Sequence, residues 1–387
     1  MRQSSGGMRI VVLGGAGEVG AAVAADLAAC PDVEELVVAD LDRSRVESEA
    51  AGLGAKASPV ALDVHDRERA RRVLAGADVL MNCTSFELFD RVIELAIAAE
   101  VNYADLLSEP TEEQRRRVEE AGITAVSGLG LTPGLSNVLV RHAAGELDEL
   151  EEVHISWVSW RTIAPSPGLL DTILWELAED CLTRQYFQNG RFHRAGFMEG
   201  SRVVEFPPPV GRHRVYFVPH TETTTLPRHF PSLRFCAVRG SWRKELMDDM
   251  RVLNKYGLLD GSARETTRAR IWERSGGERD AAPWLLFVNV EVLGMRDGIA
   301  VRRVYDASHP LAWGQEATGR STGVCAAVGA QLLGRHGRTS TGFVDPEAYY
   351  DPAEFLEELG KRGTVSVTWA DAPLNEAARE RAATTTD

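Results

Sequence analysis

The sequence predicts an α/β fold whose first domain holds a parallel sheet and whose second domain is α+β, with a mostly antiparallel sheet. Short apolar runs at residues 10–13, 36–39, 59–62 and 78–81 alternate with helical stretches, a pattern typical of parallel strands buried on both faces. From about residue 150 the pattern becomes β-rich, and segments 285–293 and 301–305 meet across Gly294-Met295-Arg296-Asp297-Gly298, a hairpin signature. A chain of 387 residues is long enough for two or three such domains.

A glycine-rich turn follows the first apolar run. In the spacing Gly15, Gly17, Gly20, the first glycine is expected to allow the sharp turn, the second to let backbone approach a pyrophosphate, and the third to let helix pack against strand. The helix that follows presents its positive N-terminal end to an anion. An ordinary glycine-rich turn is the alternative, but a strand before, a helix after and a second strand favour a dinucleotide site formed by Gly15, Ala16, Gly17, Glu18, Val19 and Gly20.

Acidic and polar residues at the ends of the following strands extend this prediction. Asp40 ends the second strand, where a carboxylate accepts hydrogen bonds from a ribose 2′-hydroxyl, so we expect NAD rather than NADP. Arg43 lies within reach of a 2′-phosphate and keeps NADP open. Because ligands bind outside the carboxyl ends of parallel strands, four further residues are expected to border the cofactor: Asp63, Val64, Asn82 and Cys83.

Composition restricts the class of partner. The chain has 43 basic and 57 acidic residues and a net charge of −14, which argues against nucleic acid and anionic membranes and favours a small molecule. The five cysteines are scattered, with no Cys-x-x-Cys pair or histidine cluster, so we expect no metal and a cytoplasmic protein with reduced thiols. The opening MRQSSGG has no apolar signal core, and no later run reaches the ~18 apolar residues of a membrane span. Met8 is therefore an alternative start.

The remaining elements divide the chain into four predicted parts. Residues 8–140 form the first domain, 141–310 the second, 311–370 a C-terminal helical segment packing on the first domain, and 371–387 a flexible tail. In the second domain we expect helices at 169–187 and 244–256, and we interpret the threonine-rich segment 220–225 as strand. A late helix near Gly319 has small residues that suit close packing, and Thr322 is expected to cap its start.

These motifs together resemble the saccharopine dehydrogenase-like family, and within it the bacterial lysine 6-dehydrogenases. The resemblance rests on the glycine turn, GLGLTPGLSN at 128–137, HTETTTLPRHF at 220–230 and VDPEAYYDPAEFLEELGKRG at 344–363, and it covers residues from Met8 to about Val367. It implies a homodimeric NAD(P)-dependent oxidoreductase that acts on the C–N bond of an amino acid or related amine through an imine. It also implies a Rossmann domain, an inserted α+β domain and a C-terminal helix that returns to the Rossmann domain.

The chain departs from the family pattern at two places. Ser159-Trp160 stands where many members have Gly-Gly, and Thr132 stands where saccharopine-type members have Asp. Both departures point away from lysine and saccharopine as the substrate.

The candidate substrate and catalytic residues each have an alternative interpretation. The loop residues border the nicotinamide and substrate, or they form a strand-to-helix connection capped by its asparagine: Gly130, Thr132, Pro133, Gly134 and Asn137. Tyr103 and Asp105 follow the fifth strand, where catalysis, substrate contact and plain surface exposure all fit. Arg161, beside Trp160, is either a bidentate partner of a substrate carboxylate or a surface arginine.

His220, with Glu222 and Thr223, is the candidate for proton transfer, against a purely structural histidine. An amine must be neutral before its carbon releases hydride, so a group near neutrality suits the base, and water is the alternative. Two other functions stay open: reductive condensation of an amine with a keto acid or aldehyde, and a non-catalytic dinucleotide-binding sensor.

Overall fold

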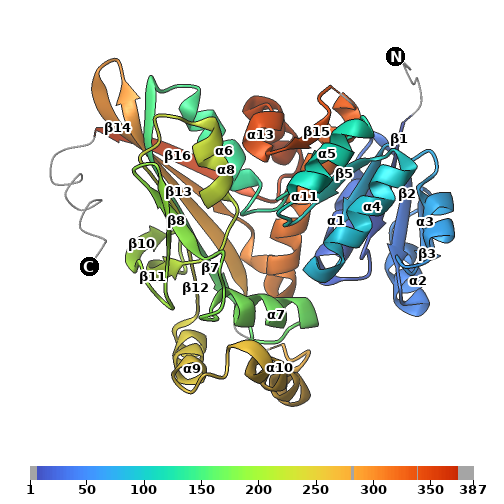
Figure 1. Cartoon of the computed structure of the whole chain (residues 1–387), viewed down its shortest axis with the longest axis horizontal. Coiled ribbons are helices and arrows are strands. Elements are labelled where there is room, and N and C mark those ends of the chain that lie inside the picture. The colour runs from blue at the N-terminus through green and yellow to red at the C-terminus, as the bar shows by residue number, and fades with distance from the viewer. Residues whose placement is uncertain (1–6, 280–282, 338, 374–387) are drawn as a thin grey trace. The chain divides into compact units, whose positions relative to one another are not determined.

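The computed structural model describes residues 7–279, 283–337 and 339–373. Its contacts divide the chain into two compact units (Figure 1). The first unit comprises Met1–Val138 and Gly319–Arg362, and the second comprises Leu139–Thr318 and Gly363–Asp387. The opening residues 1–6 and the predicted tail from residue 374 onward lie outside the described residues.

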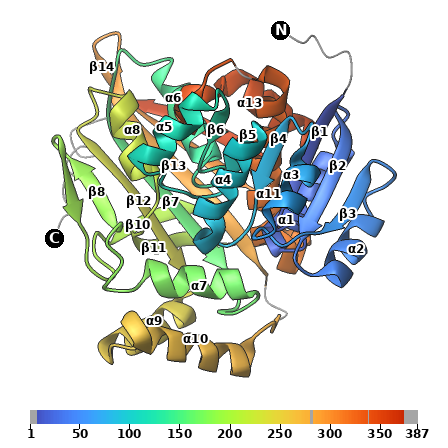
Figure 2. The ribbon, with the colours of Figure 1, turned by 45° about the vertical axis from the view of Figure 1, so that its right-hand side comes forward.

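The first unit is built on a seven-stranded sheet in the order β15-β6-β5-β4-β1-β2-β3, and every pairing in it is parallel (Figure 2). The prediction of a parallel α/β first domain is therefore confirmed. Because β2 and β4 flank β1, the winding direction reverses at β1, which is where open parallel sheets bind ligands. The strands are β1 (Met8–Leu13), β2 (Val33–Asp40), β3 (Ala57–Ala61), β4 (Val79–Asn82), β5 (Asn102–Asp105), β6 (Thr124–Val126) and β15 (Gly342–Val344).

Helices connect these strands, and a late helix returns to the unit as expected. The N-terminal helices are α1 (Glu18–Ala29), α2 (Arg43–Ala51), α3 (Arg67–Leu74), η1 (Phe86–Leu88), α4 (Phe89–Ala99), α5 (Glu112–Glu120) and α6 (Leu135–Ala144), and the returning ones are α11 (Ala317–His336), α12 (Pro346–Tyr349) and α13 (Pro352–Arg362). A Cβ on Gly323 would lie 2.6 Å from the Cβ of Ala22, so the glycine lets α11 pack closely on α1. Thr322 lies inside α11, so its predicted role as the cap was wrong.

The second unit holds a nine-stranded sheet whose main path is β10-β11-β12-β7-β13-β14-β16. The β12–β7 pair is parallel and the other pairs are antiparallel, in agreement with a mostly antiparallel sheet. The strands are β7 (Glu149–Trp160), β8 (Gln185–Gln188), β9 (Arg191–Arg194), β10 (Arg202–Phe206), β11 (Gly211–Phe217), β12 (Phe235–Trp242), β13 (Leu285–Arg296), β14 (Ile299–Ser308) and β16 (Ser366–Pro373). The predicted hairpin joins β13 to β14.

The helices of the second unit correct two predictions. They are α7 (Pro167–Glu176), α8 (Glu222–His229), α9 (Lys244–Lys255), α10 (Gly261–Ser275) and η2 (Leu311–Glu316). The helix expected at 169–187 ends at Glu176, and the Arg184 guanidinium donates a hydrogen bond to the Glu176 carbonyl oxygen. Residues 185–188 form β8 instead of helix. The threonine-rich segment interpreted as strand is the start of α8.

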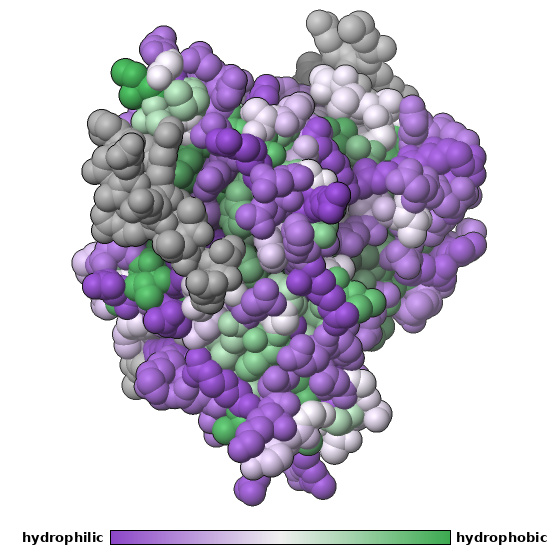
Figure 3. All heavy atoms as spheres, turned by 60° about the vertical axis from the view of Figure 1, so that its left-hand side comes forward, coloured by the Kyte–Doolittle hydropathy of each residue, from purple (hydrophilic) through white to green (hydrophobic). Residues whose placement is uncertain are grey.

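The end of the described chain also differs from the sequence prediction. We placed residues 311–370 on the first domain and began the tail at residue 371, but β16 pairs with β14 along the second sheet, with Asp371 opposite Arg303. The Arg303 guanidinium donates to both Asp371 oxygens, which holds this strand in place. Within the described ranges no helix is long and apolar enough to cross a membrane. On the face drawn in Figure 3, apolar residues form separate patches among hydrophilic ones.

Candidate functional site

The glycine turn between β1 and α1 is sterically fixed. Gly14 has a φ of +73°, and a Cβ there would lie 2.6 Å from the Cys83 carbonyl oxygen. A Cβ on Gly20 would lie 2.1 Å from the Gly14 carbonyl oxygen, and one on Gly15 would lie 2.5 Å from a methyl group of Val38. The spacing had suggested that Gly15 allows the sharp turn, but the structure shows that the turn depends on Gly14. Gly15 instead lets the turn approach β2, and Gly20 lets α1 approach the turn.

A cavity of 270 Å³ opens at the carboxyl ends of β1, β2, β3 and β4. Its walls are Leu13, Gly14, Gly17, Ala39, Asp40, Leu41, Arg45, Leu62, Asp63, Val64, Cys83, Thr84 and Ser85. Five of the predicted cofactor residues thus meet in one place. A Cβ on Gly17 would contact only the Gly14 carbonyl oxygen, at 3.1 Å, so the fold has room for a side chain that would enter the cavity.

Asp40 connects the cavity to the glycine turn. Its Oδ2 accepts a hydrogen bond from the Ala16 N–H at 3.0 Å, and Oδ1 accepts one from the Asp42 N–H at 3.4 Å. The basic residue on this wall is Arg45, which donates to the Ala16 carbonyl at 2.5 Å. Arg43 is instead exposed and pairs with Glu47. Asp42 caps α2 by accepting from the Ser44 and Arg45 N–H groups, so the helix begins one residue later and Arg43 points to solvent.

The other predicted cofactor residues support the turn rather than line the cavity. Ala16 binds Asp40 and Arg45 through its backbone, and Glu18 and Val19 form the first turn of α1, whose N-cap is Gly17. Burial and then the charge of Asp105 raise the pKa of the Cys83 thiol, so this cavity residue stays protonated at neutral pH.

A buried polar network lies directly behind the cavity. The Asn82 amide nitrogen donates to the Tyr103 hydroxyl at 3.0 Å, and that hydroxyl donates to Asp105 Oδ2 at 2.8 Å. The Ser127 hydroxyl and the Gly128 N–H donate to Asp105 Oδ1 at 2.8 and 3.3 Å. At the other end, Asn82 Oδ1 accepts from the N–H and hydroxyl of Thr84 in the cavity wall. We call these residues the Asp105 network: Asn82, Thr84, Tyr103, Asp105, Ser127 and Gly128.

Burial of this network excludes surface exposure as the explanation of Tyr103 and Asp105. Tyr103 is 1% exposed and Asp105 is 0% exposed. Burial raises the pKa of Asp105, and the hydrogen bonds that it accepts oppose that change. Burial and the neighbouring Asp105 raise the pKa of Tyr103 well above its usual range, so the phenol keeps its proton. Each group is engaged with neighbouring protein groups.

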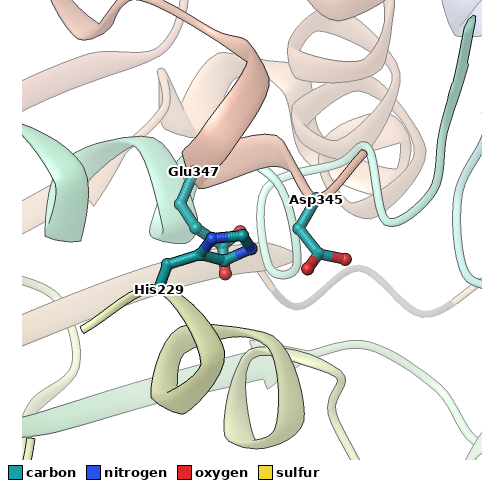
Figure 4. Close-up of side chains that lie close together, drawn as sticks. All are labelled: His229, Asp345 and Glu347. Atoms are coloured by element: carbon teal, nitrogen blue, oxygen red, sulfur yellow. The ribbon is translucent and has the colours of Figure 1, made fainter. Parts of the chain in front are cut away.

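The loop at residues 128–137 is held from two sides. Asp105 accepts from Gly128, and Asn137 Oδ1 accepts from the Gly134 N–H at 2.9 Å. The Asn137 amide then donates to Glu347 at 2.9 Å, and Figure 4 shows Glu347 and Asp345 at the start of α12, with His229 of the second unit also labelled. Gly134 has a φ of +118°, and a Cβ there would lie 2.4 Å from Gly130 backbone atoms.

Asn137 therefore acts inside the strand-to-helix connection, as the alternative interpretation expected, and Glu347 is a support that the sequence did not indicate. Pro133 is buried, and Thr132 is the partly exposed position between residues 128 and 140.

In the second unit three titratable side chains come together from two helices and the segment between β11 and α8. His220 Nε2 lies 3.9 Å from Glu176 Oε1, and His220 Nδ1 lies 3.7 Å from Glu222 Oε2. Trp157 of β7 stacks on the imidazole, with ring centroids 5.9 Å apart. We call His220, Glu176 and Glu222 the His220 cluster. The sequence analysis found His220 and Glu222 but missed Glu176, because it expected the helix to continue past that residue.

The charge state of His220 follows from these neighbours. Burial disfavours the imidazolium, but the interaction with Glu176 and the negative charges of Glu222 and Glu176 outweigh burial and raise the pKa of His220. Carboxylates beside both ring nitrogens favour a proton on each. The raised pKa favours the imidazolium form over the neutral imidazole. Thr223, the other predicted residue here, lies buried in the first turn of α8.

Trp160 and Arg161 lie at the end of β7. Arg161 is 4% exposed, so its interpretation as a surface arginine was wrong. Its Nη1 donates to the carbonyls of Thr162 and Ile163, and its Nη2 donates to the Leu169 carbonyl. These bonds hold the segment that leads into α7. The Arg243 guanidinium lies over the Trp160 ring, 5.5 Å from its centroid.

The cavity residues fit a dinucleotide. The Gly17 position leaves open the space that a Cβ would fill, α1 directs its N-terminus to the turn, and Asp40 presents a carboxylate at the end of β2. Arg45 adds a cation on the same wall. The sequence analysis missed Arg45, although Asp42 pointed to it. An aspartate N-cap accepts a hydrogen bond from the backbone N–H three positions later, which here is that of Arg45.

Comparison with known proteins agrees with this site. The family described as "Saccharopine dehydrogenase NADP binding domain" matches residues 10–126. The chain is similar to carboxyaminopropylagmatine dehydrogenase of Synechocystis, with 24% identity over 92% of this chain and 96% of that protein. It is also similar to carboxynorspermidine synthase of Vibrio alginolyticus, with 27% identity over 38% of this chain and 35% of the synthase.

A solved structure with the same fold is saccharopine dehydrogenase (L-Glu forming) of Saccharomyces cerevisiae, with a TM-score of 0.72, 16% identity, and 95% and 100% of the two chains covered. Another is homospermidine synthase of Legionella pneumophila in complex with NAD, with a TM-score of 0.62, 15% identity, and 94% and 91% covered. Residues 10–126 therefore match the cofactor domain of saccharopine dehydrogenases, and the chain as a whole resembles the saccharopine dehydrogenase-like family.

Proposed function

We propose that this protein oxidises or reduces the C–N bond of a small amine or amino acid, with NAD(P) as the hydride carrier. The observation that carries the proposal is the cavity at β1–β4, where Gly17 and Asp40 meet in a segment that matches a saccharopine dehydrogenase cofactor domain. The full-length similarity to an enzyme named for an agmatine derivative supports an amine substrate.

Gly17, the N-terminus of α1 and Asp40 would hold the cofactor, with Asp63, Val64, Cys83 and Thr84 forming the rest of the wall. When bound, the nicotinamide supplies or accepts the hydride. We propose NAD as the preferred form because Asp40 would repel a 2′-phosphate. Arg45, rather than Arg43, is the residue that softens this preference, since it lies on the cavity wall.

His220 is the proposed proton-transfer residue. As an imidazolium it donates a proton to the substrate nitrogen when the C–N bond is reduced, and in the oxidative direction it must first lose that proton. Glu222 and Thr223 would lie beside the substrate with it. Tyr103 and Asp105 are reassigned from catalysis to positioning, because their polar atoms are bonded within the Asp105 network.

The loop Gly130, Thr132, Pro133, Gly134 and Asn137 is proposed to border the substrate, with Thr132 as its accessible member. Trp160 would contribute apolar surface, and Arg161 holds the backbone before α7. We also propose a cytoplasmic homodimer, which the family resemblance and five unbridged cysteines support.

Reductive condensation of an amine with a carbonyl compound is a second candidate, favoured by the similarity to carboxynorspermidine synthase. A panel of amines distinguishes the two reactions: oxidation needs one amine and NAD(P)+, whereas condensation needs an amine and a keto acid or aldehyde together with NAD(P)H. A dinucleotide sensor would bind NADH without turnover of any amine.

Gly17→Val tests the cofactor site. We expect a folded variant whose NADH affinity falls by more than about 100-fold, equivalent to about 2.7 kcal/mol, because the branched side chain would occupy the space for the pyrophosphate. Titration of NADH fluorescence measures it. Gly52→Val is the matched control, since no atom lies within 4 Å of a Cβ built at Gly52. Unchanged affinity in folded Gly17→Val would remove the phosphate site.

A further inference from the structure

Thr84 lies in the cavity wall directly after β4, and its hydroxyl is also one end of the Asp105 network. The Thr84 N–H and hydroxyl contact Asn82 Oδ1 at 3.0 and 2.7 Å. Thr84 is partly exposed, whereas Asn82 is 0% exposed. The network thus joins a surface that a molecule in the cavity can contact to side chains that solvent does not reach.

The backbone of Thr84 fixes the direction of the hydrogen bonds in this network. Because a backbone N–H can only donate, the Asn82 atom beside it must be the amide oxygen, and the amide nitrogen must face the Tyr103 hydroxyl, 3.0 Å away. The Tyr103 oxygen accepts from that nitrogen, so its own proton goes to Asp105 Oδ2 at 2.8 Å. Two further donors bind Asp105 Oδ1, as an ionised carboxylate requires.

The Thr84 hydroxyl has a fixed role for the same reason. Asn82 Oδ1 can only accept, so the hydroxyl proton points to it and the lone pairs of Thr84 Oγ1 remain. The Ser85 carbonyl, 3.5 Å from Oγ1, is itself an acceptor and does not use those lone pairs. Toward a molecule in the cavity the hydroxyl is therefore an acceptor, which favours a ligand N–H or O–H and disfavours a phosphate oxygen.

The order of the strands indicates which part of a dinucleotide would meet Thr84. β2, which ends at Asp40, lies on one side of β1, and β4, which precedes Thr84, lies on the other. A dinucleotide extends across the point where the strand order reverses. With Asp40 as the proposed partner of the adenosine ribose and Gly17 as the proposed pyrophosphate position, the β4 side is left for the nicotinamide half. The donors on that half are the ribose hydroxyls and the carboxamide N–H groups.

We propose that the Thr84 hydroxyl is a fixed acceptor for a hydrogen-bond donor on the nicotinamide half of the cofactor, a ribose hydroxyl or the carboxamide N–H. The inference rests on the proposed function and adds to it a residue that sets how the cofactor lies in the cavity. Asn82 takes the Thr84 proton from behind, so the hydroxyl cannot turn to donate toward the ligand without losing that bond.

The test measures dissociation constants of NADH, ADP-ribose and ADP for the wild type, Thr84→Val and Thr84→Ser by calorimetry. Valine keeps the shape of threonine without the hydroxyl, and serine is the matched control because it keeps the hydroxyl. We expect Thr84→Val to weaken NADH binding by about 3- to 10-fold, the range for one neutral hydrogen bond. ADP, which has no nicotinamide half, should bind Thr84→Val as it binds the wild type, and Thr84→Ser should bind NADH like the wild type.

ADP-ribose distinguishes the two donors, since it keeps the ribose and lacks the nicotinamide. A loss of affinity in Thr84→Val that ADP-ribose shares with NADH assigns a ribose hydroxyl as the donor. A loss confined to NADH assigns the carboxamide, and 3-acetylpyridine adenine dinucleotide, which lacks the carboxamide N–H, should then bind Thr84→Val and the wild type equally.

Two results would overturn the acceptor role: unchanged NADH affinity in Thr84→Val, or equal weakening of NADH and ADP, which would show a general disturbance of the cavity. Both leave the proposed reaction standing, because that reaction is tested by amine turnover with NAD(P). A wild-type protein that binds NADH without turnover of any amine would refute the reaction, and an NADH-specific loss in Thr84→Val would still support the acceptor. Thr84→Ala provides a second variant without the hydroxyl if Thr84→Val does not fold.

Discussion

Two buried polar groups of this protein differ in how completely their own chain satisfies them. In the Asp105 network, donors to Asp105 lie at 2.8 to 3.3 Å, and the chain of hydrogen bonds continues to Thr84. In the His220 cluster the ion pairs measure 3.7 and 3.9 Å, and Glu176 Oε2 lacks a donor among the residues described. Both groups are buried, so burial does not distinguish them.

The difference separates a carboxylate that joins several elements of the fold from one whose hydrogen bonds are incomplete. Asp105 fixes the loop at 128–137 relative to β4 and β5, since its bonds join Gly128 to Tyr103 and Asn82. Glu176 connects α7 to His220 through Oε1 at 3.9 Å, and its Oε2 has no donor among the described residues. A buried carboxylate with several donors is costly to remove, whereas one with an unsatisfied oxygen and a single long ion pair can be replaced at lower cost to folding.

Removal of His220 should have the largest effect and would test the ligand-binding half of this comparison. We expect His220→Ala to lower turnover by about 10²- to 10⁴-fold with little change in NADH affinity, because the residue transfers a proton and lies outside the cofactor cavity. Stopped-flow or steady-state rates and NADH titration measure the two quantities.

The pH profile provides the control for this prediction. Since the pKa of His220 is raised, its neutral form grows only as pH rises through that higher value, so oxidative turnover should increase across that range and reductive turnover should decrease. Both pH dependences, of oxidative and of reductive turnover, should be absent in His220→Ala. If the wild-type rates of oxidation and of reduction both stay constant across this pH range, His220 has a structural role.

Asp105→Ala would test whether the Asp105 network stabilises the fold. We expect the free energy of unfolding to fall by about 3 kcal/mol, because the buried donors of Tyr103, Ser127 and Gly128 lose their acceptor. Glu176→Met should change the same quantity by less than about 1 kcal/mol or increase it. Urea denaturation measures both. The comparison breaks if Asp105→Ala is as stable as the wild type while turnover is lost.

Asp40 has both a structural contact and a position at the cavity. Its Oδ2 accepts a hydrogen bond from the Ala16 N–H, and its carboxylate also lines the cavity. Asp40→Asn should keep an acceptor for Ala16 while removing the charge, so the preference for NAD over NADP should narrow by about 10- to 100-fold, or 1.4 to 2.8 kcal/mol. Dissociation constants for both cofactors measure this.

Arg45→Ala should shift the ratio in the opposite direction by a smaller factor, and Arg43→Ala should leave it unchanged because Arg43 pairs with Glu47 in solvent. An enzyme whose ratio responds to Arg43 and ignores Arg45 would contradict the placement of α2.

The sequence predicted the fold and the cofactor turn well because both depend on local patterns. Apolar strands, the Gly15-x-Gly17 spacing and a terminal Asp40 are determined within a few residues of each other, and the structure brings Gly17, Asp40, Asp63 and Cys83 to one cavity. The cavity wall carries Arg45 and not Arg43 for a local reason too: Asp42 caps α2, and a shift of two residues along a helix nearly reverses the direction of a side chain.

The second unit was less predictable because its site depends on long-range pairing. Glu176 and His220 are far apart in sequence, and their approach depends on where α7 ends and on α8 forming in a threonine-rich segment that contains Pro227. Similarly, the polar sequence of β16 gives little indication of a strand until β14 is known to lie beside it.

The hydrogen bond from Ala16 to Asp40 restricts how this enzyme can change its cofactor in evolution. A substitution that admits a 2′-phosphate must remove a carboxylate that also ties the glycine turn to β2. Alanine or glycine at this position would admit the phosphate but release the turn, so the intermediate would bind neither cofactor well. Asparagine avoids this loss, and with Arg45 already in place the chain is one substitution away from accepting the other nucleotide.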